Sequence, residues 1–171
     1  MIKYAKVINA ETGLCDVGLG TNSEYYQSIG MTEQDVELSD VDNQWYLASM
    51  CPHKTEEEKA AEREANFKSQ FFEIPNYGWF RKVPKGYSSA VESMNTASIA
   101  VSMMQGLPAG MLIFYPEPDY TIPEQCTEEW LVEHQILSQA MTVQEFGALY
   151  MAFIQAWNTQ EHVNLEESEE E

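Results

Sequence analysis

The sequence has no Lys or Arg after position 85. All nine basic residues lie in the first half of the chain: Lys3, Lys6, Lys54, Lys59, Arg63, Lys68, Arg81, Lys82 and Lys85. Residues 86–171 hold fourteen Asp and Glu, which gives them a formal charge of −14, against −5 for the first 85 residues. Because neutralising phosphates requires Lys or Arg, this absence argues against nucleic acid, an anionic membrane or nucleotide phosphates as direct ligands of the second half.

Long hydrophobic runs are also missing. No window reaches the roughly 18 apolar residues that a membrane-spanning helix requires. The N-terminal MIKYAKVINAETG has neither the apolar core nor the small-residue cleavage site of a secretory signal. The three cysteines, Cys15, Cys51 and Cys126, are odd in number and far apart, which fits a reduced intracellular site of synthesis. We therefore expect synthesis in a cytoplasm and no membrane partner.

Sequence signatures of catalysis are missing as well. The chain contains no G-x-S-x-G, G-x-x-x-x-G-K-[ST] or G-x-G-x-x-G pattern. Glu129, Glu133 and His134 lie within two helical turns, but a carboxylate pair performs acid–base chemistry only where burial separates the two pKa values. An exposed acidic helix face is the favoured interpretation, and we predict no enzymatic activity and no cofactor.

Four side chains are potential zinc ligands: Cys51, His53, Cys126 and His134. Zinc sites usually combine short pairs such as C-x2-4-C and H-x3-5-H. The spacings found here, C-x-H and C-x7-H, are neither. The sequence therefore favours an ordinary loop cysteine and two surface histidines, and no metal site is predicted.

What is present indicates an α+β fold. The apolar share of 44% is that of a globular protein, and 171 residues suffice for one domain or two small units. Residues 1–51 predict a small β-meander of about four strands, in which Gly13 supplies a positive φ in the first turn and Asn22 or Ser23 caps a single helical turn. Residues 52–70 predict a connector helix that opens with the capping box Thr55-x-x-Glu58 and has a weak apolar stripe.

Residues 71–160 predict a mainly helical α+β domain with a few short strands. Strands are expected near 78–83 and 111–115, and helices after the capping signals at Ser89, Thr127 and Thr142. The helix expected after Thr127 covers 128–138. The last helix has the clearest apolar face, made of Val143, Phe146, Tyr150, Phe153 and Trp157 and widened by Leu149, Met151 and Ile154. Residues 161–171, with six Glu and no base, predict an acidic disordered tail.

Aromatic and basic residues mix at one place in the chain, and this is the candidate binding patch: Tyr77, Trp79, Phe80, Arg81, Lys82, Lys85 and Tyr87. Such a mixture is typical of a stacking platform for a sugar, a peptide or a single strand. The simpler interpretation is a half-buried strand and turn whose bases offset the surrounding acids.

Two segments carry a resemblance to a known group of proteins. IGMTEQDVE and WYLASMCP, leading into TEEEKAAERE, resemble the N-terminal unit of small accessory proteins encoded in tail regions of phages and prophages of gut bacteria. FFEIPNYGWFRKVPKGYSSAVESMNTA, with FYPEPDYTIPEQCTEEWL, resembles a C-terminal unit from the same setting. The resemblance covers about 1–70 and 71–162. It implies a virion-associated or assembly role and assigns no catalytic residue.

Three functional hypotheses follow. The leading one is a non-enzymatic phage structural or assembly protein that binds tail components or copies of itself, present in the host cytoplasm during synthesis and then in the virion. The second is an acidic anti-defence inhibitor that occupies a host protein's nucleic-acid site. The third is a small enzyme of unrecognised type.

Overall fold

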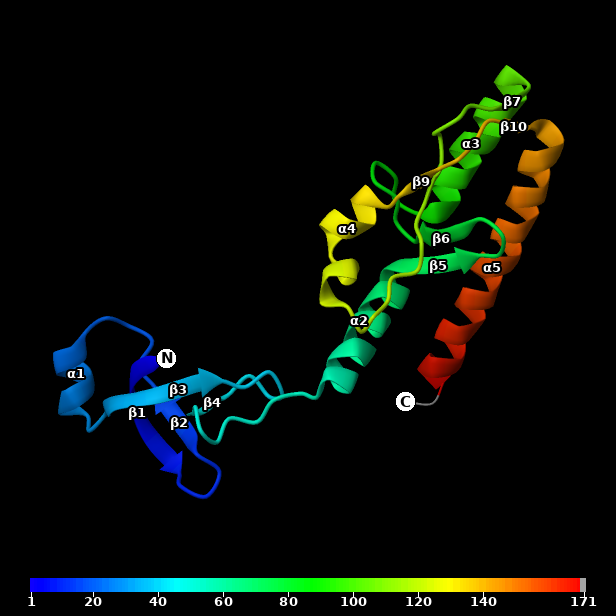
Figure 1. Cartoon of the computed structure of the whole chain (residues 1–171). Helices are drawn as coiled ribbons and strands as arrows, with labels where there is room; N and C mark the ends of the chain where they lie inside the picture. Colours follow the sequence, from blue (N-terminus) through cyan, green and yellow to red (C-terminus); the bar gives the residue numbers. More distant parts are fainter. Residues whose placement is uncertain (170–171) are drawn as a thin grey trace. The chain divides into compact units, whose positions relative to one another are not determined.

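The computed structural model describes the backbone of residues 1–169 and the side chains of residues 1–160. It divides into two compact units, Met1–Lys59 and Ala60–Glu171. Strands dominate the first unit and helices the second (Figure 1). The α+β class expected from the sequence is therefore confirmed. The predicted disordered tail at 161–171 lies outside the residues whose side chains are described, although the backbone of the last helix is helical to Glu169.

The first unit is a closed four-stranded antiparallel barrel with strand order β1-β2-β4-β3. Its elements are β1 (Ile2–Asn9), β2 (Leu14–Val17), α1 (Ser23–Ser28), β3 (Thr32–Leu38) and β4 (Trp45–Leu47). β1 pairs with both β2 and β3, and β4 closes the ring by pairing with the same two strands. The predicted meander is wrong in its connectivity. A meander leaves two unpaired sheet edges, whereas closure pairs the backbone groups of both.

Local turn chemistry in this unit follows the prediction. Gly13 has a φ of +76°, and a Cβ at this position would lie 2.8 Å from the Cβ of Met50. Both observations require glycine here. The Asn22 side chain caps α1 by accepting a hydrogen bond from the backbone N–H of Tyr25 at 3.0 Å.

The hydrophobic core of the first unit is small. Ala5, Cys15 and Val36 form one buried cluster, around which Val7, Val17, Trp45 and Leu47 pack with partial exposure. The N-terminal ammonium adds polar contacts, since it donates to the Asp35 carboxylate at 2.8 Å and to the Val36 carbonyl at 2.7 Å. Because burial stabilises by only about 25 cal/mol per Å² of apolar surface, such a small unit depends more than an ordinary domain on additional cross-links.

α2 (Glu56–Gln70) begins at the predicted capping box. The Glu58 carboxylate accepts from the backbone N–H of Thr55 at 2.7 Å, and the Thr55 hydroxyl accepts from the N–H of Glu58 at 3.2 Å. Near its end, Phe67 is buried and stacks on Phe71, with 4.5 Å between ring centroids. The division between the units falls inside α2, after Lys59, so most of the segment expected to be a connector belongs to the second unit.

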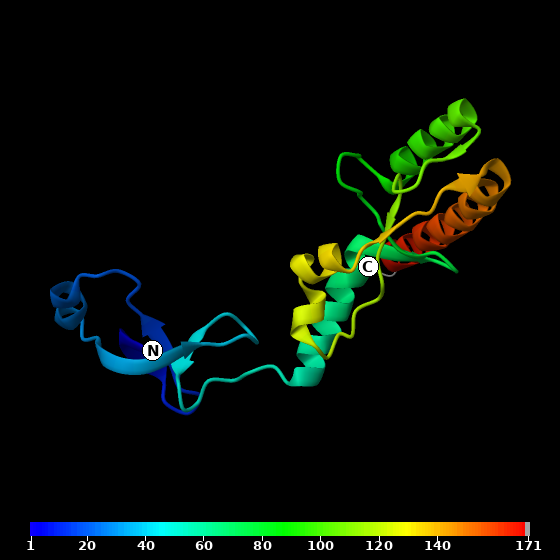
Figure 2. The same ribbon diagram turned by 45° about the horizontal axis from the view of Figure 1, so that its top comes forward.

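The second unit is built on one hairpin and two long helices. β5 (Phe71–Ile74) pairs with β6 (Gly78–Arg81), and both views show α3 (Ala90–Met104) alongside α5 (Val143–Glu169) (Figures 1 and 2). Both helices begin as predicted. Ser89 accepts from the N–H of Glu92 at 3.1 Å, and Thr142 accepts from the N–H of Glu145 at 3.2 Å.

Short strand pairs complete this unit. β7 (Gly106–Leu107) pairs with β10 (Met141–Thr142), and β8 (Ile113–Phe114) with β9 (Ile136–Leu137). Between β8 and β9 lie a 3-10 turn, η1 (Pro123–Cys126), and α4 (Glu128–Glu133). The helix predicted over 128–138 is therefore too long. Residues 136–138 bond to the β8 segment instead, and the buried Ser138 donates its N–H to the Leu112 carbonyl at 2.8 Å.

The main core of the second unit is aromatic. Phe153 of α5 is only 1% exposed, and its ring lies 5.9 Å from that of Phe72 and 6.3 Å from that of Phe80. The predicted apolar face of the last helix is thus confirmed at its centre. Val143 and Met151 of the same predicted face are 53% and 69% exposed.

A second aromatic cluster lies beside the first. It contains Phe67, Phe71, Tyr115 and Leu131, with Trp79, Tyr120 and Trp130 packed against it. This cluster connects the end of α2 to α4 and to the hairpin. Two of its rings, Phe71 and Tyr115, lie against the Arg81 guanidinium.

Candidate functional site

The aromatic members of the predicted aromatic–basic patch are largely structural. Phe80 is 2% exposed and packs in the main core, with 5.5 Å between its ring and that of Phe114. The Trp79 ring meets Phe67 edge-on at 5.1 Å. The two residues are neighbours on β6, and alternation along the strand sends them to the two different clusters.

The Arg81 guanidinium is surrounded by other side chains of the unit and does not project toward a ligand. Its guanidinium lies over the rings of Phe71 and Tyr115, at 4.7 and 4.9 Å from their centroids. Its Nε donates to the Tyr115 hydroxyl at 3.2 Å, and its Nη2 pairs with the Glu128 carboxylate. Burial alone would lower the pKa of Arg81, but the hydrogen bonds with Glu128 and Tyr115 outweigh it and raise that pKa. A cation neutralised in this way is not available to a phosphate.

The patch residues line three different hollows. Tyr77 lines a groove against α5, and Lys82 lines a hollow with Trp79. Phe80, Arg81, Lys85 and Tyr87 line a third hollow together. The seven residues therefore do not all face one platform, although four of them share one hollow.

Tyr77 lines a groove in the second unit. It has a volume of about 640 Å³ and lies between the β5–β6 turn and one side of α5. The α5 side consists of Ala148, Ala152 and Ala156 with Gln155, Thr159 and Gln160, and the turn contributes Glu73, Pro75, Asn76 and Tyr77. Its polar groups are amides, two hydroxyls and one carboxylate, a set that includes no nucleophile–base pair.

Exposed apolar side chains gather at the end of the unit where α3 stops and α5 starts. Ile99, Met103 and Met104 of α3 are 62%, 79% and 66% exposed, and Val143 of α5 is 53% exposed. The β7–β10 pair joins the two helix ends at this place (Figure 1). We call these four residues the methionine end. The sequence alone does not indicate this surface, because Val143 follows the apolar pattern of the last helix and nothing local places it beside the end of α3.

One buried polar atom lacks a partner in the part of the chain whose side chains are described. It is Nη2 of Arg63, on α2. The Nε of the same side chain donates to the Tyr120 carbonyl at 3.0 Å. A cavity of about 280 Å³ beside it is lined by Arg63, Phe67, Cys126 and Glu128 among others. A buried donor of this kind is ordinarily satisfied by water.

The potential zinc ligands divide between the two units. Cys51 and His53 belong to the first, and Cys126 and His134 to the second. Cys126 is half-buried on η1, and the His134 ring stacks on Trp130 with 4.2 Å between centroids. The Glu129 and Glu133 side chains are exposed, as the sequence suggested.

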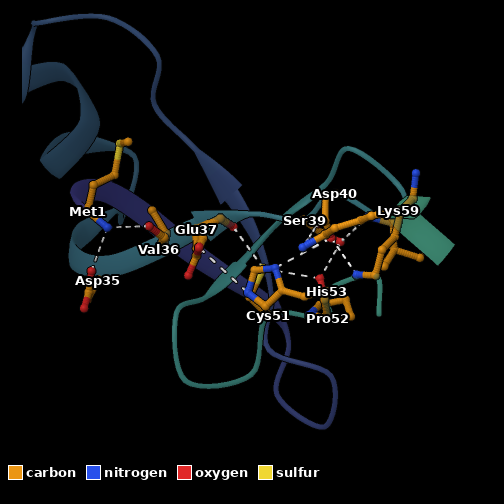
Figure 3. A network of polar contacts seen from close by, with 12 residues as sticks. Met1, Asp35, Val36, Glu37, Ser39, Asp40, Cys51, Pro52, His53 and Lys59 are labelled. Atoms are coloured by element: carbon orange, nitrogen blue, oxygen red, sulfur yellow. Dashed lines mark hydrogen bonds and ion pairs between the residues drawn. The ribbon is translucent and has the colours of Figure 1, made fainter. Parts of the chain in front are cut away.

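In the first unit, the side chains of Cys51 and His53 lie close to an acidic residue, Glu37, that the spacing of potential metal ligands in the sequence does not reveal. Glu37 is the second-last residue of β3, and its carboxylate lies beside both side chains (Figure 3). Burial raises the pKa of the Cys51 thiol, and the charges of Glu37, Asp40 and Asp42 raise it further. No ligand spacing in the sequence identifies Glu37. Its position follows from the pairing of β3 with β4, after which the chain returns along the end of β3 and Sγ of Cys51 donates to the Glu37 carbonyl at 3.7 Å.

Asp40 belongs to the same cluster and contacts His53, Lys54 and Lys59. Its carboxylate accepts from the backbone N–H of Lys54 at 2.8 Å, pairs with the Lys59 ammonium at 3.4 Å and lies 3.6 Å from Nδ1 of His53 (Figure 3). The Lys54 N–H, followed by Lys59, lowers the pKa of Asp40. The carboxylate is therefore ionised and fixed in place at neutral pH.

Comparison with known proteins gives no further assignment: no family model, no curated protein and no solved structure matches the chain. Among the described residues, no helix combines the length and the apolar character needed to cross a membrane.

Proposed function

We propose that the protein is a non-enzymatic structural or assembly protein of a phage or prophage, and that it acts by binding other tail components. The resemblance of its two segments to tail-region accessory proteins supports the setting. The methionine end supports the mode of action. On this proposal the chain is made in the host cytoplasm and then becomes part of the virion.

The exposure of the methionine end is the observation that carries the proposal. Ile99 and Met103 are four residues apart and therefore share the outer face of α3, where both are more than 60% exposed. Methionine is enriched at the centres of protein interfaces, because its flexible and polarisable side chain adapts to different partner surfaces. Apolar side chains grouped at one end of a unit favour a protein partner over a small polar ligand.

The charge of the second half of the chain restricts the kinds of partner that it can bind. Residues 86–171 contain no Lys or Arg, and the Arg81 guanidinium is paired with the Glu128 carboxylate. A partner with an apolar centre and basic residues around it would complement this unit. A nucleic acid would be repelled by it.

The proposal is tested in a phage or prophage that encodes the chain. Met103→Glu places a charge at the centre of the methionine end, and the matched control is Met151→Glu, a similarly exposed methionine of α5. Mass spectrometry of purified virions then measures how much of the chain is incorporated per tail. Circular dichroism confirms that both variants fold, and light scattering of the wild-type chain reports self-association.

We expect normal incorporation of Met151→Glu and a loss of tenfold or more for Met103→Glu. Equal incorporation of both variants refutes the methionine end as the binding surface. A wild-type chain that is absent from virions, yet produced early in infection, refutes the tail role and supports the acidic-inhibitor hypothesis.

A further inference from the structure

Three side chains with different donor atoms converge where the chain leaves the barrel of the first unit. Glu37 comes from β3, and Cys51 and His53 from the segment between β4 and α2 (Figure 3). One carboxylate oxygen, the Sγ atom and one imidazole nitrogen all lie within 4.8 Å of one another. We propose that Glu37, Cys51 and His53 bind a zinc ion, with water as the fourth ligand.

The separations of the donor atoms suit a tetrahedral ion. Zinc lies about 2.3 Å from sulfur and about 2.0–2.2 Å from nitrogen and oxygen, which places neighbouring ligand atoms about 3.3–3.8 Å apart. Glu37 Oε1 and His53 Nε2 are already at 3.8 Å. Both side chains are about half exposed, at 50% and 45%, so rotation about their own torsions closes the remaining gap to Cys51 without moving the backbone.

The chemistry of the donors selects the ion. Mg²⁺ and Ca²⁺ prefer sites made of oxygen alone, whereas zinc accepts sulfur, nitrogen and oxygen together. A thiolate, a carboxylate and a neutral imidazole carry two negative charges, which balance a divalent cation. The proton that the Cys51 thiol loses on binding is released to solvent.

Asp40 is placed to orient the histidine. When Nε2 of His53 faces the metal, Nδ1 faces the Asp40 carboxylate, 3.6 Å away. This distance is longer than a hydrogen bond, and the ring rotation that brings His53 onto the metal can shorten it. Metal-bound histidines commonly donate their second ring N–H to a carboxylate. Asp40 is itself fixed by the N–H of Lys54 and by Lys59.

The place of the cluster in the fold gives the metal a role. The first unit has a very small hydrophobic core, and small units gain stability from metal cross-links. A metal held by Glu37, Cys51 and His53 would join the end of β3 to the segment between β4 and α2. Because the unfolded chain does not hold these ligands together, the free energy of binding adds to the free energy of folding of this unit.

Cobalt(II) is the probe, because its bond to a thiolate produces a charge-transfer absorption and tetrahedral coordination produces intense visible bands. The full chain is treated with chelator, kept reduced without added thiols and titrated with CoCl₂. We expect both absorptions to saturate at one cobalt per chain and to disappear when zinc is added. A thermal scan of the full chain should show an unfolding transition that moves to higher temperature with zinc.

Matched variants locate the site. Cys51→Ser should remove the charge-transfer band, His53→Gln and Glu37→Gln should weaken cobalt binding by tenfold or more, and Asp40→Asn should weaken it by about 10–100-fold. Cys126→Ser and His134→Gln are the controls, and they should bind like the wild type. His53→Gln and Glu37→Gln alter exposed side chains, so they report on the site even if Cys51→Ser does not fold.

Two results would overturn the assignment. One is a cobalt titration of the wild-type chain without a thiolate band. The other is a band that survives in Cys51→Ser or disappears in Cys126→Ser. Either result leaves the tail-binding proposal untouched, because the methionine end belongs to the other unit.

Discussion

Replacing Phe153 by Ala tests the packing of the second unit directly. The ring is 1% exposed and contacts aromatic rings of β5, β6 and α5 itself, at centroid distances of 5.9 Å to Phe72, 6.3 Å to Phe80 and 6.1 Å to Trp157. Removing it abolishes the transfer free energy of a buried phenyl group and leaves a cavity. Substitutions of this kind lower the free energy of unfolding by about 3–5 kcal/mol. The rigid neighbouring rings cannot collapse into the space, which favours the upper part of that range.

Urea unfolding followed by circular dichroism provides the measurement. With a slope of about 2 kcal/mol per molar urea, the unfolding midpoint of the second unit should fall by about 1.5–2.5 M. Met151→Ala on the same helix is the control, because Met151 is 69% exposed and its truncation should change the free energy of unfolding by less than about 0.5 kcal/mol. Equal midpoints for the two variants would show that α5 does not pack against the hairpin through Phe153.

The other predictions concern the stability of the first unit, the acid dependence of the stability of α5, the ionisation of Tyr120 and nucleic-acid binding. Gly13→Ala should destabilise the first unit by about 1–3 kcal/mol in thermal or urea unfolding, because φ is +76° and the new Cβ would meet Met50 at 2.8 Å; an unchanged midpoint would contradict this geometry. The backbone N–H of Thr142, followed by its hydroxyl, lowers the pKa of Glu145 in the folded protein. The ionised Glu145 therefore stabilises the folded state fully above the unfolded-state pKa of about 4.3, and this stabilisation is lost as the pH falls through the lower pKa of the folded state. Glu145→Gln should therefore flatten the fall in stability of α5 below about pH 5, and an unaltered acid profile would refute the capping role. Burial, aided by the hydrogen bond to Glu117, raises the pKa of Tyr120, so Tyr120 should stay protonated at about pH 11, one unit above the ordinary tyrosine pKa. The tyrosinate absorbance of Tyr120→Phe at this pH should therefore equal that of the wild type. A lower absorbance in the variant would show that Tyr120 ionises normally. In a gel shift at low salt, micromolar protein should form no complex with DNA or RNA, and a salt-sensitive complex would contradict the electrostatic argument.

Much of the secondary structure could be predicted because its signals are local. Thr55 with Glu58 and Thr142 with Glu145 each form a reciprocal capping box within four residues. At α3 the Ser89 hydroxyl accepts from the N–H of Glu92, and the Glu92 carboxylate accepts from the N–H of the neighbouring Ser88. The helices α2, α3 and α5 begin at these signals. The positive φ of Gly13 likewise follows from a turn of a few residues. These features involve neighbours in the chain, so no tertiary contact is needed to specify them.

Predictions failed where distant segments compete for the same groups. The helix expected to continue to residue 138 ends at Glu133, because Ile136 and Leu137 pair with β8. The strands of the first unit close into a barrel because β1 pairs with β3, a contact that the order of strands in the sequence does not encode. The aromatic–basic patch is divided among three hollows, since alternation along β6 sends Trp79 and Phe80 to different clusters and Arg81 is enclosed by Phe71, Tyr115 and Glu128. Only Phe80, Arg81, Lys85 and Tyr87 line one hollow together.

The sequence by itself determined the α+β class, the starts of the long helices, the buried centre of the last helix and the one-sided charge of the chain, because composition, periodicity and capping are short-range properties. Only the tertiary structure decided which side chains meet. Glu37 meets Cys51 and His53 because the chain that follows the β3–β4 pair returns to the end of β3. The β7–β10 pair joins the end of α3, with the exposed Met103 and Met104, to the start of α5, with the exposed Val143. Contacts between residues far apart in the chain depend on how all the elements pack at once, and no local pattern contains that information.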